Sequence, residues 1–114
     1  MHPVPGRPGA VLSDFGAGRR YDILLQPLLA EGIGTTYVVG QREPRLMGWY
    51  VGRTDHDVHP AATVVMKASG HPDFRFATLL CPVAKGEPLP EVESLGDGRF
   101  AIAFHGRRSL VTLR

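Results

Sequence analysis

Short stretches in which apolar and polar residues alternate recur along the whole chain. In the segment 21–29, Tyr21, Ile23 and Leu25 fall on one face of an extended strand, which is the two-residue period of β structure. The leucines of this segment also fit one face of a helix, but Pro27 would interrupt a helix interior. We therefore predict a strand here, with Pro27 at an edge or a bulge.

The other segments with strand character are equally short. Turn residues at 70–73 and an Asp-Gly pair at 97–98 predict that the strands on either side of each turn form hairpins. The segment 52–60 is polar and is predicted to be a loop. The remaining predicted strands are 10–15, 35–39, 46–51, 61–68, 74–81, 91–95, 100–105 and 109–113. Eight or nine short strands without an amphipathic helix predict an all-β, antiparallel sandwich.

Length and composition agree with one small β domain. The chain has 114 residues, 43% of them apolar, and 14 Gly and 10 Pro suit many short strands joined by tight turns. Residues 1–9 hold three prolines and two glycines and are expected to be a disordered lead-in, which leaves 10–114 as the domain. Cys81 is the only cysteine, so no disulfide forms within the chain.

Charge and hydropathy argue against two classes of partner. Thirteen Lys and Arg against eleven Asp and Glu give a net charge of +2, and the arginines are scattered, so we expect no nucleic-acid binding. The first residues have neither the basic nor the apolar region of a signal peptide, and no apolar run has the ~20 residues of a membrane span. The localisation is therefore open; a complete chain of this kind would stay in the cytoplasm.

One cluster of residues fits a surface that binds a sugar. Trp49 and Tyr50 are adjacent, so a strand directs them to opposite faces and one ring can be exposed. An exposed ring beside Arg53 and His56 would stack on a sugar, while the cations bind a carboxylate or sulfate. The alternative, which the sequence favours, is that Trp49 fills the core and Tyr50 lies at its rim.

Other chemistry has weaker support. His56 and His59, with the carboxylates beside them, are candidate metal ligands, but Pro60 excludes the helical spacing that would bring them together. A solvated polar loop is the favoured interpretation. Cys81 has the context of a small buried apolar residue, the serines lack a nucleophile motif, and the turn at 16–18 lacks the rest of a dinucleotide motif. We therefore predict no catalytic residue and no cofactor.

Several motifs, in this order along 10–114, resemble the C-terminal region of the heparinase II/III-like polysaccharide lyases. The segment from Val11 to Asp22 is similar to the family's strand, Gly-rich turn and strand, and Gly48-Trp49-Tyr50 is similar to its Gly-Trp segment. The segment from Phe74 to Pro82 resembles the family's Thr-Leu-Leu-Tyr-Pro strand, and the tail from Phe100 to Leu113 resembles its closing hairpin.

The resemblance implies a β module beside a helical toroid. In that family the catalytic Tyr and His residues come mainly from the toroid, which this chain does not contain. The chain also has Arg19 or Arg20 and Gln26 where histidines are expected, and Cys81 where an aromatic residue is usual. We therefore expect a C-terminal structural and substrate-cleft module of a lyase acting on an anionic, uronic-acid-containing polysaccharide. Its expected partners are a helical toroid domain and the polysaccharide, and it is not expected to be catalytic alone. The alternative is a free-standing carbohydrate-binding module for an anionic glycan.

Overall fold

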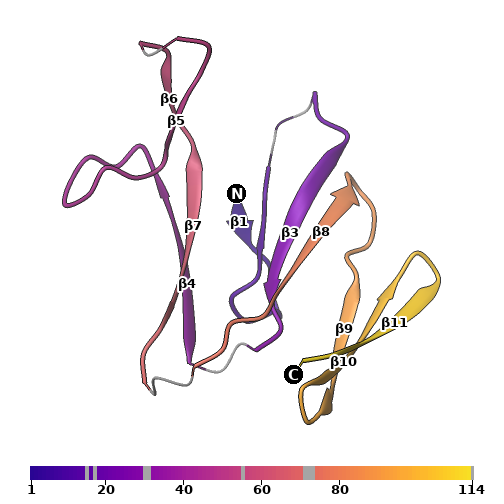
Figure 1. The fold of residues 1–114 in the computed structure, drawn as a ribbon. Coiled ribbons are helices and arrows are strands. Elements are labelled where there is room, and N and C mark those ends of the chain that lie inside the picture. Colours follow the sequence, from indigo (N-terminus) through magenta and orange to yellow (C-terminus); the bar gives the residue numbers. More distant parts are fainter. Residues whose placement is uncertain (15, 17, 30–31, 55, 71–73, 114) are drawn as a thin grey trace. The chain divides into compact units, whose positions relative to one another are not determined.

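The computed structural model describes residues 1–14, 16, 18–29, 32–54, 56–70 and 74–113 (Figure 1). These residues form eleven strands and no helix, every strand pairing is antiparallel, and no sheet closes into a barrel. The predicted all-β, antiparallel fold class is thus confirmed. The chain divides into two compact units, Met1–Ala30 with Arg75–Arg114, and Glu31–Phe74. Among the described residues, none lies in a helix long and apolar enough to cross a membrane.

The first unit contains a four-stranded sheet whose two long strands are far apart in the sequence. Its order is β1 (His2–Pro3), β2 (Val11–Leu12), β3 (Tyr21–Pro27) and β8 (Thr78–Ala84). β3 and β8 pair over their whole lengths, from Tyr21 opposite Ala84 to Pro27 opposite Thr78. This pairing brings the N-terminal and C-terminal parts of the chain into one unit.

Pro27, the last residue of β3, and Pro82 of β8 both occupy positions at which the β3–β8 pairing requires no N–H group. The N–H of Leu28 donates to the carbonyl of Ala77 (2.7 Å), and the N–H of Lys85 donates to the carbonyl of Arg20 (3.0 Å). Antiparallel bonding alternates along a strand, so Pro82, opposite Ile23, is at a position whose nitrogen points away from β3. β8 is the edge strand of this sheet, so the missing N–H of Pro82 leaves no partner unpaired.

The first unit also contains a three-stranded sheet made of two consecutive hairpins. It consists of β9 (Glu91–Gly96), β10 (Arg99–Phe104) and β11 (Arg107–Thr112), with β10 in the centre. Asp97 and Gly98 have φ values of 53° and 72°, and the two residues between β10 and β11, His105 and Gly106, have 54° and 70°. Positive φ at both central residues is the type I′ conformation, whose twist matches that of the paired strands.

The core of the first unit is small and lies where its two sheets meet. Ala10, Leu24 and Val83 are buried, and Leu24 is 0% exposed. Phe104 of β10 packs against this cluster, as does Leu89, which follows β8. Contact between antiparallel sheets through one apolar layer is the arrangement of a β-sandwich.

The second unit consists of two antiparallel ribbons. β4 (Ile33–Val39) pairs with β7 (Ala62–Ala68) over seven residues, and β5 (Trp49–Val51) pairs with β6 (Val58–Pro60). Gly48 is the only described residue of this unit that is buried. The unit therefore has little core of its own.

The structure corrects three expectations. The predicted hairpin between 61–68 and 74–81 is wrong, because β7 pairs with β4 and β8 pairs with β3. The predicted loop 52–60 ends in a strand, β6. The lead-in 1–9, expected to be disordered, begins with a strand, because His2 and Pro3 pair with Leu12 and Val11. The turn predicted at 70–73 lies largely outside the described residues.

Leu24→Ala should destabilise the protein strongly. Its side chain is fully buried at the centre of the first unit, and removing buried methyl groups from such a site costs about 2–5 kcal/mol. Leu80→Ala in the same sheet is the control, because Leu80 is 63% exposed and its loss should change stability by only about 0.5 kcal/mol. Urea unfolding followed by circular dichroism measures both; equal effects would contradict this core assignment.

Candidate functional site

The most distinctive side-chain cluster of the second unit lies on the β5–β6 hairpin. Tyr50 and His59 are cross-strand partners, and their rings stack with centroids 5.1 Å apart and planes 25° from parallel. Tyr50 is 53% exposed, and His59 is exposed as well. The hairpin therefore presents two nearly parallel rings to solvent.

Asp57 fixes the loop that joins the two strands and also holds His59. One of its carboxylate oxygens contacts His59 Nε2, and the other accepts a bond from the Arg53 N–H (3.3 Å). Its backbone carbonyl accepts a bond from the Gly52 N–H (2.6 Å), and its own N–H donates to the Thr54 carbonyl (2.9 Å). Asp57 and the Tyr50 ring thus both contact the imidazole and restrict its position.

Trp49 is held on the opposite face of the hairpin. Its indole Nε1–H donates to the backbone carbonyl of Gln41 (2.9 Å), and the guanidinium of Arg42 lies 5.6 Å from the ring centroid. The ring is only partly exposed. A satisfied indole N–H and a cation over the ring indicate a structural role for Trp49. It does not fill a core as expected, because its side chain is only half-buried and Gly48 is the one buried residue described in this unit.

Gly48 connects this hairpin to the β4–β7 ribbon. Its carbonyl accepts bonds from the N–H groups of Gly40 (2.9 Å) and Ala61 (2.8 Å), so it contacts the backbone that follows β4 and the backbone that precedes β7. Its φ is 79°, and a Cβ at this position would lie 2.6 Å from the Val38 carbonyl oxygen. Only glycine fits both the conformation and the space.

The structure brings together only part of the predicted sugar-binding set. Tyr50 is exposed as that hypothesis requires, but its neighbouring ring is His59 rather than His56. His56 and Arg53 are exposed in the loop, and neither side chain forms a hydrogen bond or ion pair with another described residue. Trp49 points to the other face. The contribution of His59 follows from the β5–β6 register, which the polar composition of 52–60 does not reveal.

The described residues contain no group of three or more His, Cys, Asp or Glu side chains that could hold a metal ion. His59 is committed to Asp57 and Tyr50, and His56 is not part of that cluster. Asp55, the remaining carboxylate near the candidate pair, lies outside the described residues. The histidine pair therefore has no third ligand among the residues that the structure describes.

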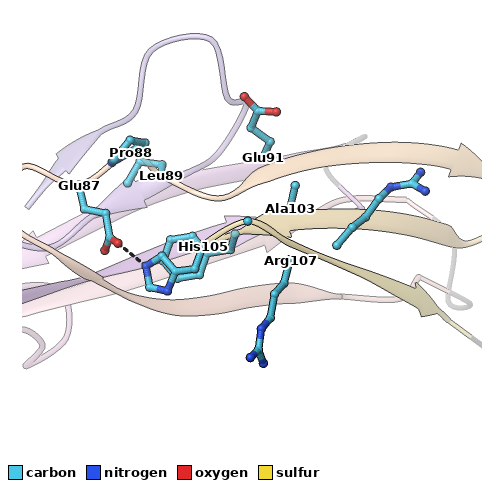
Figure 2. Close-up of a pocket in the computed structure, with 10 residues that line it drawn as sticks. Glu87, Pro88, Leu89, Glu91, Ala103, His105 and Arg107 are labelled. Atoms are coloured by element: carbon cyan, nitrogen blue, oxygen red, sulfur yellow. Dashed lines mark ion pairs between the residues drawn. The ribbon is translucent and has the colours of Figure 1, made fainter.

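The first unit has an open pocket of about 530 Å³ beside the β10–β11 turn. Figure 2 shows Glu87 next to His105, with which it forms an ion pair, and Arg107 directed away from Glu91. The Phe104 and His105 rings stack with centroids 3.8 Å apart. Glu87 also accepts a bond from the Ala84 N–H (3.1 Å), so the ion pair joins the end of β8 to the β10–β11 turn. We assign this contact a structural role.

Two further groups, both in or beside the four-stranded sheet, have shifted pKa values. Burial raises the pKa of the Cys81 thiol, and the nearby Glu87 carboxylate raises it further. Cys81 is therefore a poor nucleophile at neutral pH. A hydrogen bond from the Gly16 N–H lowers the pKa of Asp14, and so does Lys85, whose Nζ lies 3.6 Å from it. Lys85 also lies 3.5 Å from Asp22, so it links the loop after β2 to β3.

No protein-family model, no curated protein and no solved structure matches the chain.

Gly48→Ala should displace the β5–β6 hairpin, because the new methyl group would collide with backbone atoms and the positive φ would be strained. We expect a loss of more than about 1 kcal/mol and a red shift of the fluorescence of Trp49, the only tryptophan. Gly34→Ala is the matched control in the same unit, since nothing lies within 4 Å of its added Cβ and its φ is not positive. An unchanged Trp49 spectrum in Gly48→Ala would refute the role of Gly48.

Proposed function

We propose that the chain is a non-catalytic β module that contacts an anionic polysaccharide through the outer face of its β5–β6 hairpin. In this proposal it acts as the C-terminal substrate-cleft module of a heparinase II/III-like lyase. The contact face, here called the ring face, consists of Tyr50 and His59, with Arg53 in the adjoining loop. The observation that carries the proposal is the exposed stack of Tyr50 on His59.

The chemistry of the ring face supports a sugar ligand. A sugar ring offers axial C–H groups that pack on the face of an aromatic ring, and Tyr50, which stacks on His59 but stays 53% exposed, leaves ring surface for this contact. The Arg53 side chain has no partner among the described residues, so its guanidinium is available to a carboxylate or sulfate. Asp57 restrains the His59 ring before a ligand binds, which reduces the entropy lost on binding.

The lyase context rests on the resemblance of ordered segments to the heparinase II/III-like family. The segment compared with the family's Thr-Leu-Leu-Tyr-Pro strand begins β8, which pairs with β3 along its full length. The segment compared with the closing hairpin forms β10 and β11. These segments are structural, which agrees with a module that supports a cleft and leaves the chemistry to another domain.

A free-standing carbohydrate-binding module is the second candidate. The observation in its favour is that Tyr50, Asp57 and His59 all come from one hairpin of one unit. Such a face needs no residue from another domain. The two candidates differ in whether the chain alone binds the glycan with useful affinity.

Binding of heparin and alginate oligosaccharides to the full chain tests the proposal, with calorimetry as the measurement. Tyr50→Ala should weaken binding about fivefold, the equivalent of about 1 kcal/mol of ring contact. Arg53→Ala should weaken it more at about 50 mM salt than at about 500 mM, because salt screens an exposed charge. Tyr37→Ala is the matched control, since Tyr37 is an exposed tyrosine of the same unit (42%) on β4.

Equal losses in Tyr50→Ala and Tyr37→Ala, or binding that neither Tyr50→Ala nor Arg53→Ala reduces, would refute the ring face as the binding surface. Absence of binding by the chain alone would remove the free-standing module. In that case the cleft-module proposal requires binding to appear when a helical lyase domain is added, and its continued absence would refute this proposal too.

A further inference from the structure

The outer edge of β11 is open and regular. In the described part of the chain β10 is the only strand that pairs with β11, so one side of β11 has no strand beside it. The only register shift in this sheet lies between β9 and β10, at Arg99 and Phe100. Prolines and β-bulges commonly protect an edge strand from pairing with another chain, and β11 has neither.

The backbone groups that face this edge can be identified. The Leu113 N–H donates to the Gly98 carbonyl (2.7 Å), and the two-residue turn makes Phe104 and Arg107 a hydrogen-bonded pair. Odd-numbered residues of β11 therefore bond to β10. By alternation, Arg108, Leu110 and Thr112 direct their N–H and C=O groups outward.

We propose that β11 pairs with β11 of a second copy of this chain, antiparallel and about a two-fold axis, to form one continuous sheet. Two outward-facing strands pair symmetrically when Leu110 lies opposite Leu110 of the second copy. Arg108 then lies opposite Thr112, and Arg107 lies opposite Leu113. A two-fold interface uses the same surface on both copies, as this register requires.

The side chains of β11 fit this self-pairing. Leu110 is 68% exposed on the isolated chain, and in the dimer the two leucines would cover each other at the axis. Neither arginine of β11 meets an arginine of the second copy, so the register avoids the repulsion of like charges placed directly opposite. In this register β11 provides an apolar contact at the two-fold axis, and each of its arginines lies opposite an uncharged residue of the second copy.

The other edge of this sheet is less suited to a second copy. β9 carries Glu91 and Glu93 and follows Pro90. Residues of the N-terminal turn, Gly6 to Pro8, line the same pocket as β9, and Arg7 donates to the Pro90 carbonyl. The N-terminal turn therefore already lies beside β9, whereas the described residues place no strand beside the outer edge of β11.

Analytical ultracentrifugation of the full chain tests the dimer. The wild type should sediment with about twice the monomer mass, and Leu110→Asp should be monomeric, because it places two carboxylates opposite each other at the axis. Leu46→Asp is the matched control, since Leu46 is exposed to a similar extent (76%) but lies in the second unit, and it should remain dimeric. A monomeric wild type would overturn the proposal, as would a dimer unaffected by Leu110→Asp or open-ended assembly.

Cysteine cross-linking in a Cys81→Ser background tests the register. Leu110→Cys should form a disulfide between copies under mild oxidation, because paired residues at such a position have Cα atoms about 5.5 Å apart, within the range for a disulfide. Val111→Cys is the control: it points to the other sheet face, and its partner in the second copy is Ser109. Cross-linking of neither variant, or of both equally, would overturn the register.

Discussion

The pairing of β3 with β8 is the constraint on which the rest of the structure depends. It joins residues separated by about fifty positions, so the entropy of closing that loop must be offset by the pairing itself and by the apolar side chains that it buries. Leu24, at the middle of β3, is the best-buried residue of that core. The pairing gathers both ends of the chain into one unit and makes 31–74 an insertion between two neighbouring strands.

This arrangement explains why the proposed binding face lies in a unit that has almost no hydrophobic core. The inserted unit has no buried side chain among its described residues and is held mainly by strand pairing and by the bonds of Gly48. Its aromatic side chains are therefore partly or largely exposed. Tyr50 and His59 stack on each other, and both side chains still remain exposed.

The sequence predicts the positions of most strands, but it does not predict correctly which strands pair with each other. Alternation is a property of a single strand, so it located β3, β4, β7 and the last three strands. The hairpin of β9 and β10 was predictable because Asp97 and Gly98 specify its turn locally. The hairpin predicted between 61–68 and 74–81 is wrong because neighbouring strands in sequence need not pair, and the burial gained by β3 with β8 depends on distant residues. Tyr50 was identified as a candidate from its residue type, whereas His59 as its ring partner depends on a register that no local signal specifies.

We propose that an anionic glycan contacts the face of the β5–β6 hairpin that bears Tyr50 and His59. The most direct test is nuclear magnetic resonance of the ¹⁵N-labelled chain during titration with a size-defined heparin oligosaccharide. We expect the largest amide shift changes in β5, β6 and the loop that holds Arg53, together with changes in the ring signals of His59. Changes confined to the pocket beside His105, or no changes at saturating oligosaccharide, would contradict this proposal.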